Sequence, residues 1–146
     1  MTPDEARRLL RIHSGRDADS DPAKWETGFV GQLRPYRGSL NEANFREVMA
    51  AIRVLAPKIA ESEFVDRELI ADLWSLIWFP RMWAFPPDGM LRRNDLIDGQ
   101  ALSVLDDWLN RIAEAVSYAL EGSPESVNEA MIEYGQPLPD FLKGRG

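Results

Sequence analysis

The chain contains one histidine, His13, followed directly by Ser14, and these are the residue types that nucleophilic or acid–base catalysis would need. Neighbouring residues at the end of a helix do not face each other, so this pair does not form a catalytic Ser–His couple. The chain has no cysteine. Two-histidine zinc sites, thiolate nucleophiles and disulfides are therefore excluded within one chain. The preferred interpretation places His13 at a helix C-terminus, where it interacts with the helix dipole.

Neighbouring carboxylates could in principle bind a metal ion. Asp106, Asp107 and Asn110 superficially resemble an Asp-Asp-x-x-Asp magnesium motif, in which acids four residues apart on a helix hold a hard cation. The chain is far too short for the folds that use this motif, and the second half of such a site is missing. A solvated helix face is the favoured interpretation of Asp106 and Asp107. Glycine-rich phosphate loops are also absent. The sequence therefore predicts a protein that is not an enzyme and that holds no metal or cofactor.

The acidic charge balance indicates which class of macromolecule this protein binds. The net charge is −7, and residues 61–146 carry sixteen acidic against seven basic side chains. This balance disfavours nucleic acid and anionic membranes and favours a basic protein partner. Glu68 and Asp72 lie four residues apart, where like charges repel on a helix, which favours an exposed acidic face. The candidate acidic contacts are Glu61, Glu63, Glu68, Asp72, Asp88, Asp106 and Asp107.

Aromatic residues gather around a proline in the middle of the chain. Five of them, at positions 74, 78, 79, 83 and 85, fall within twelve residues around Pro80. Helical spacing puts Trp74 and Trp78 on one face, and we expect that face to be core, since one buried aromatic removes about 150–250 Å² from water. Trp83 and Phe85 are balanced between core and interface. Trp83 joins the candidate partner contacts because tryptophan is enriched at interface hot spots.

Five helical segments position these residues. Capping residues and apolar spacing predict helices over residues 3–13, from a cap at Ser39 to a limit at Pro57, from about Asp66 to a kink or end at Pro80, from a cap at Asp98 to Gly122, and from Ser123 to Gly135. Residues 15–38 are predicted as a long irregular loop with a turn cluster at 17–22, and 136–146 as an extended tail. The chain is therefore expected to be one all-α domain over residues 1–146.

The N-terminal segment and the lengths of the apolar segments indicate the cellular compartment. The N-terminus lacks a basic start followed by an apolar run, and no stretch of about 18 apolar residues exists. These features favour a cytoplasmic protein. The small size and the excess of arginine over lysine, 14 against 3, favour a bacterial source.

A short, acidic, cysteine-free helical chain has a composition similar to that of bacterial immunity and antitoxin proteins, which bind and block one cognate toxin. This resemblance concerns composition and not particular residues, and it implies inhibition by steric occlusion. Two alternatives remain open. One is an enzyme or small-ligand binder with an anion pocket near Pro80, held by Arg81, Arg92 or Arg93. The other is a homodimer built on the helix that follows Asp98.

Overall fold

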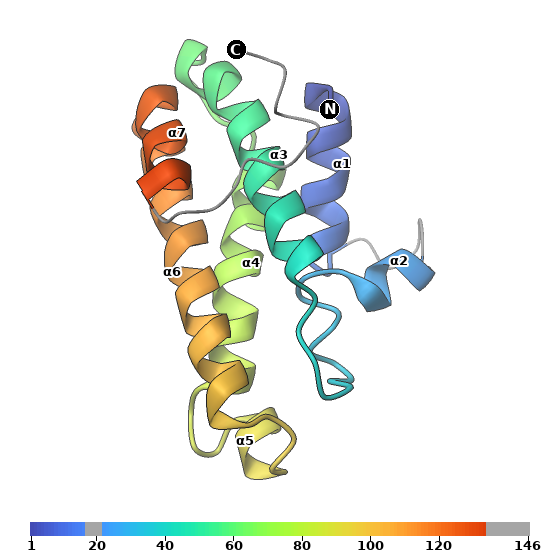
Figure 1. Ribbon diagram of the computed structural model, residues 1–146. Coiled ribbons are helices and arrows are strands. Elements are labelled where there is room, and N and C mark those ends of the chain that lie inside the picture. Colours follow the sequence, from blue (N-terminus) through green and yellow to red (C-terminus); the bar gives the residue numbers. More distant parts are fainter. Residues whose placement is uncertain (17–21, 134–146) are drawn as a thin grey trace.

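The computed structural model describes residues 1–16 and 22–133, and in this part of the chain every regular element is a helix. Seven helices follow one another (Figure 1): α1 (Pro3–His13), α2 (Pro22–Thr27), α3 (Glu42–Glu61), α4 (Arg67–Ala84), α5 (Met90–Arg93), α6 (Gly99–Leu120) and α7 (Pro124–Glu133). The prediction of an all-α domain is confirmed. The two helices beyond the predicted five are the short segments α2 and α5.

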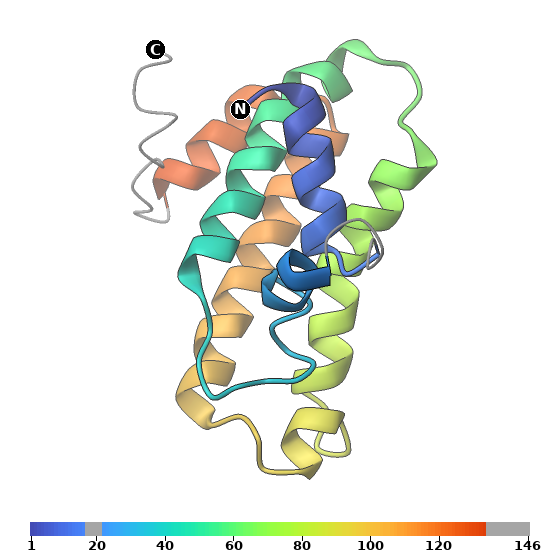
Figure 2. The same ribbon diagram turned by 90° about the vertical axis from the view of Figure 1, so that its right-hand side faces the viewer.

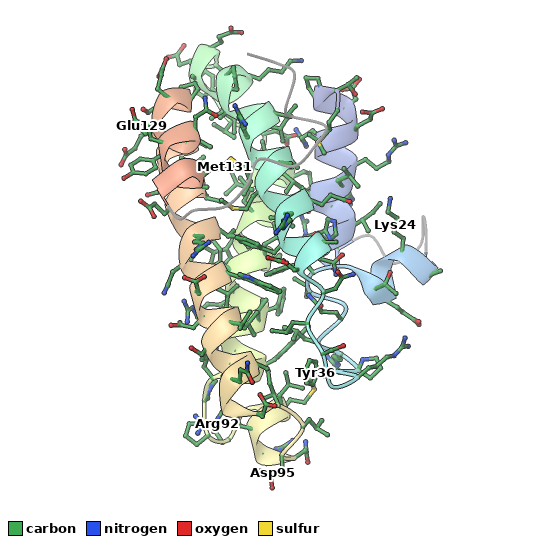
Figure 3. All side chains as sticks on the ribbon, viewed as in Figure 1. Lys24, Tyr36, Arg92, Asp95, Glu129 and Met131 are labelled. Carbon is green, nitrogen blue, oxygen red and sulfur yellow. The ribbon has the colours of Figure 1, made fainter. Side chains whose placement is uncertain are left out.

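Four long helices form the bundle. α1 packs against α3, α3 against α6, α6 against α4 and α4 against α1, while α7 covers the seam between α3 and α6. Side chains fill the space between these helices (Figure 3). The labelled Arg92 and Asp95 mark the end of the bundle occupied by α5, far from α7. α4 runs along one edge, and no other described helix covers its outer side (Figure 2).

Local capping signals set most helix ends. Thr2 caps α1 in the predicted capping box with Glu5, and Asp66 and Asp98 cap α4 and α6 through side-chain bonds to backbone N–H groups. Gly122, with φ +79°, follows the end of α6 in the left-handed conformation that glycine adopts without a Cβ clash. These ends match the sequence prediction.

The predicted limit at Pro57 and the predicted start at Ser39 were wrong, and of the two outcomes predicted at Pro80, a kink or an end, the end is excluded. α3 begins after Asn41, whose side chain accepts from the Ala43 N–H, and not at Ser39. α3 continues through Pro57 to Glu61, and Pro80 does not end α4, which continues to Ala84. In both cases an apolar residue beyond the proline is buried, and this burial outweighs one lost backbone hydrogen bond.

The predicted irregular loop is only partly seen. Residues 22–27 form α2 within it, and residues 28–36 form turns that carry the buried Phe29 and Leu33. Residues 17–21 of the predicted turn cluster, the predicted helix end at Gly135 and the predicted tail at 136–146 lie outside the described residues.

Candidate functional site

The predicted acidic contacts do not gather on one surface. Glu61 and Glu63 are exposed near the start of α4, whereas Asp88 is exposed in the turn after its end. α4 has 18 residues. At 1.5 Å per residue that is about 27 Å of helix between them. These three acids have no ion-pair partner within the described part of the chain. They are the members of the predicted set that remain free to attract a basic partner.

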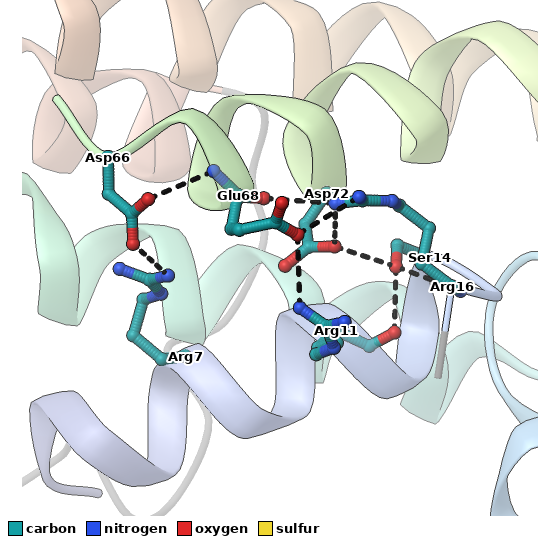
Figure 4. Close-up of polar contacts among 7 residues, drawn as sticks. All are labelled: Arg7, Arg11, Ser14, Arg16, Asp66, Glu68 and Asp72. Carbon is teal, nitrogen blue, oxygen red and sulfur yellow. Dashed lines mark hydrogen bonds and ion pairs between the residues drawn. The ribbon is translucent and has the colours of Figure 1, made fainter. Parts of the chain in front are cut away.

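Glu68 and Asp72 belong to an ionic clasp between α1 and α4 (Figure 4), which we define by Arg7, Arg11, Ser14, Arg16, Asp66, Glu68 and Asp72. Arg7 bonds Asp66 at 2.7 Å. Arg11 and Arg16 bond Glu68 at 3.2 and 3.0 Å. Arginines from the end of α1 thus neutralise the acids that the sequence suggested for a partner. The predicted repulsion between the acids at 68 and 72 is avoided because arginine lies between them.

Asp72 itself is 1% exposed, which corrects the expectation of an exposed acidic pair. Its Oδ1 accepts from Arg16 at 2.9 Å and from the Ser14 hydroxyl at 3.2 Å. Burial raises the pKa of the Asp72 carboxyl, and this outweighs the lowering by the Arg16 guanidinium. A carboxylate in this position holds α1 against α4 and is not accessible to a partner.

Asp106 and Asp107 are also paired. Arg81 bonds Asp106 at 2.6 Å and the Asn110 amide oxygen at 2.7 Å, and Arg111 pairs with Asp107 at 3.0 Å. Among residues 1–16 and 22–133, no three acids, histidines or cysteines come close enough to hold a metal ion. The same contacts engage Arg81, so it is not available for the anion pocket considered from the sequence.

His13 has a structural environment. It is buried, its Nδ1 accepts from the Phe29 N–H at 3.0 Å, and its Nε2 lies 3.0 Å from Glu47. Because Nδ1 accepts, the proton sits on Nε2 and is donated to the Glu47 carboxylate. This hydrogen bond lowers the pKa of Glu47. The single hydroxyl proton of Ser14 is shared between the Arg11 carbonyl at 2.7 Å and Asp72 at 3.2 Å, so no described contact joins Ser14 to the imidazole.

Replacing His13 should test this role. His13→Leu leaves the buried Phe29 N–H without an acceptor, which costs about 1–3 kcal/mol of the free energy of unfolding. His13→Asn keeps an oxygen near the Nδ1 position and should lose clearly less. Urea unfolding followed by circular dichroism measures both variants. Equal losses would show that the hydrogen bond to Phe29 does not support the fold.

The outer side of α4 carries an apolar stripe, formed by Trp74, Trp78 and Met82 at successive helical turns. These side chains are 59%, 45% and 44% exposed. The rings of Trp74 and Trp78 stack with centroids 5.9 Å apart. The expectation that the two tryptophans are core is therefore wrong. The core face of the same helix is built from Leu69, Leu73, Leu76, Pro80 and Ala84.

The sequence contained a signal for this stripe. α4 is apolar on nearly its whole circumference, and such a helix is either buried on all sides or offers one face to a partner. At the edge of a four-helix bundle only one face meets the core. The aliphatic residues of α4 are buried where the helix packs against α1 and α6, and the two tryptophans remain exposed.

Trp83, the aromatic candidate contact, lies half-buried beside the stripe. Its ring contacts Phe79, with centroids 5.3 Å apart, and the Arg34 guanidinium lies 5.6 Å from its centroid. These three side chains line a cavity of about 350 Å³ between α4, the end of α1 and the loop after α2. Phe85, also half-buried, lies under the Arg81 guanidinium at 5.0 Å.

No protein-family model, curated protein or solved structure matches this chain significantly. None of the helices in the described ranges is both long and apolar enough to cross a bilayer. Any assignment of function therefore rests on the geometry above.

Proposed function

We propose that this protein is a non-enzymatic protein-binding module that docks a partner protein on the stripe of Trp74, Trp78 and Met82. The observation that carries the proposal is the exposure of two stacked tryptophans and a methionine on one helix face. Tryptophan and methionine are enriched in protein interfaces, and tryptophan is prominent among hot spots. In its narrower form, the proposal is an immunity- or antitoxin-type inhibitor that covers the working surface of a basic toxin domain.

The stripe explains retention of a partner, and charge explains its attraction. Burying one tryptophan removes up to about 150–250 Å² from water, so two tryptophans and a methionine supply the apolar centre of an interface. The net charge of −7 attracts a basic protein at long range. Within the described residues Glu61, Glu63 and Asp88 flank the two ends of α4 without ion-pair partners. The partner that fits is a basic protein with an apolar patch or groove.

The non-enzymatic part of the proposal is supported by the state of the reactive groups. His13 is engaged by Phe29 and Glu47, and Asp72 by Arg16 and Ser14. Each of these groups sits in a contact that holds two segments of the fold together. A homodimer through α6 is not favoured, because its predicted apolar residues Leu105, Leu109 and Ile112 are buried within the single chain.

The test first identifies the partner protein and then measures the kinetics of its binding. A photocrosslinking amino acid placed at position 82, which leaves both tryptophans of the stripe in place, captures the neighbouring protein in cells. The purified pair is then studied by surface plasmon resonance. Trp78→Ala should weaken binding about 30-fold or more, mainly through faster dissociation, as for a hot-spot residue worth about 2 kcal/mol. The melting temperature of the free protein should be nearly unchanged.

Leu120→Ala is the matched control, because Leu120 is as exposed as Trp78 but lies at the end of α6. Its binding should equal that of the parent. The association rate of the parent should also fall as salt rises from 0.01 to 0.1 M, since the Debye length shortens from roughly 30 to 10 Å. Equal affinity of Trp78→Ala and the parent would refute the stripe as the docking surface. A salt-independent rate would refute a basic partner.

A further inference from the structure

The cavity beside Trp83 is a second feature that the stripe does not use. Phe79 and Trp83 come from α4, Val30 and Arg34 from the loop after α2, and Ser14 and Gly15 from the end of α1. Its volume of about 350 Å³ lies at the low end of the range for small-molecule pockets, which is about 300–1,000 Å³. Such a space admits a molecule with one or two rings.

The walls of the cavity are mainly apolar. The rings of Phe79 and Trp83 are in tilted contact at 5.3 Å, and Val30 adds an aliphatic surface. An aromatic ligand would find ring faces and edges in the offset arrangement that aromatic pairs prefer.

Arg34 supplies one positive charge to this apolar space. Nearby arginines of the fold are occupied: Arg16 binds Glu68 and Asp72, and Arg81 binds Asp106. Arg34 differs, because within residues 1–16 and 22–133 its contact is the face of Trp83 and no carboxylate lies within ion-pair distance. A guanidinium fixed over an aromatic face keeps its N–H fork available for a carboxylate.

We propose that this cavity binds a small aromatic carboxylate, with its ring against Phe79 and Trp83 and its carboxylate on the Arg34 guanidinium. The site goes beyond the proposed protein docking, because none of the three stripe residues lines the cavity. It also differs from the anion pocket considered from the sequence, because none of Arg81, Arg92 and Arg93 lines this cavity.

Four small molecules separate the contribution of the aromatic ring from that of the carboxylate. Phenylacetate and indole-3-acetate carry both ring and charge, phenylacetamide lacks the charge, and acetate lacks the ring. Isothermal titration calorimetry of the full chain should show binding of the two aromatic carboxylates. Phenylacetamide should bind at least tenfold more weakly than phenylacetate, because the charge-assisted hydrogen bonds are lost. Acetate should not bind measurably.

Two arginine variants test whether the ligand binds in this cavity. Arg34→Gln should weaken phenylacetate at least tenfold and abolish its advantage over phenylacetamide. Arg93→Gln makes the same charge change at an exposed position outside the cavity and should leave affinity unchanged. Circular dichroism should give the same melting temperature for both, since both side chains are exposed. In NMR spectra phenylacetate should shift the Trp83 indole N–H, assigned through Trp83→Phe.

Three outcomes would overturn the proposal: no binding of either aromatic carboxylate at millimolar concentration, equal affinity for phenylacetate and phenylacetamide, or equal effects of Arg34→Gln and Arg93→Gln. These results do not depend on the partner protein. A failure here therefore leaves the test of Trp78→Ala intact, and a failure there leaves this one intact.

Discussion

Trp108→Ala is expected to lower the free energy of unfolding by about 3–5 kcal/mol, the usual cost of removing a buried tryptophan. Trp108 is 6% exposed, its ring stacks on Phe45 at 5.2 Å with an interplanar angle of 3°, and it meets Phe29 at 6.3 Å. These contacts join α6, α3 and the loop after α2. The substitution leaves a cavity at their junction, which the surrounding rigid helices cannot close.

Trp74→Ala is the matched substitution, since it removes the same side chain from the outer side of α4. The free energy of unfolding should change by no more than about 0.5 kcal/mol, as for a surface position. Urea unfolding followed by circular dichroism measures both variants. At the size of this chain, the loss expected for Trp108→Ala corresponds to a fall in melting temperature of roughly 10–20 °C. Similar losses for the two variants would place Trp74 in the core and remove the basis for the docking stripe.

The comparison of these tryptophans shows where sequence reasoning succeeds. Trp108 lies on the α6 face whose apolar spacing repeats at three and four residues, and that face is buried as expected. The spacing is informative because the opposite face of α6 is polar. On α4 both faces are apolar, so periodicity cannot tell which one meets the core. Only the position of α4 at the edge of the bundle decides that Trp74 and Trp78 remain outside.

Helix ends were predictable for a related reason. A cap such as Asp98 or Thr2 acts on N–H groups within three residues, so the sequence window contains the whole interaction. Pro57 and Pro80 also act locally, but their cost is offset by contacts made with other helices. The apolar residues beyond them, Ile59 and Ala84, are buried against elements distant in sequence. Those contacts are not readable from a local pattern.

The pairing of charges was the least predictable property. Seven acids looked alike as exposed residues, yet Glu68, Asp72, Asp106 and Asp107 are neutralised by arginines. Three of the four arginine partners lie on a different helix or turn from the acid they bind; only Arg111 is a neighbour on the same helix. The number of acidic residues therefore overstates how many acids are free to meet a partner, although the net charge of −7 is unchanged by this pairing. The free acids are found only when the fold brings each arginine to its partner.

Charge reversal at two acids of the ionic clasp should cost much more stability at the buried Asp72 than at the half-exposed Glu68. Asp72→Lys removes the buried partner of Arg16 and adds a positive charge beside it, so we expect a loss of about 3–5 kcal/mol in the free energy of unfolding. Glu68→Lys changes charge by the same amount one turn away, at a half-exposed side chain. Its expected loss is within about 1 kcal/mol, the range for surface ion pairs.

Asp72→Asn completes the series, because it keeps the size of the side chain and an oxygen for the Ser14 hydroxyl while it removes the charge. Its stability should lie between those of the parent and Asp72→Lys when all are measured by urea unfolding at neutral pH. If Asp72→Lys is as stable as Glu68→Lys, the contact between α1 and α4 is not organised by this carboxylate. If the order holds, a reversal at Asp72 strongly destabilises the fold, so its effect on binding cannot be assigned to the lost attraction of a partner. The electrostatic test of docking then belongs to Glu61→Lys and Glu63→Lys, whose side chains are exposed and have no ion-pair partner within residues 1–16 and 22–133.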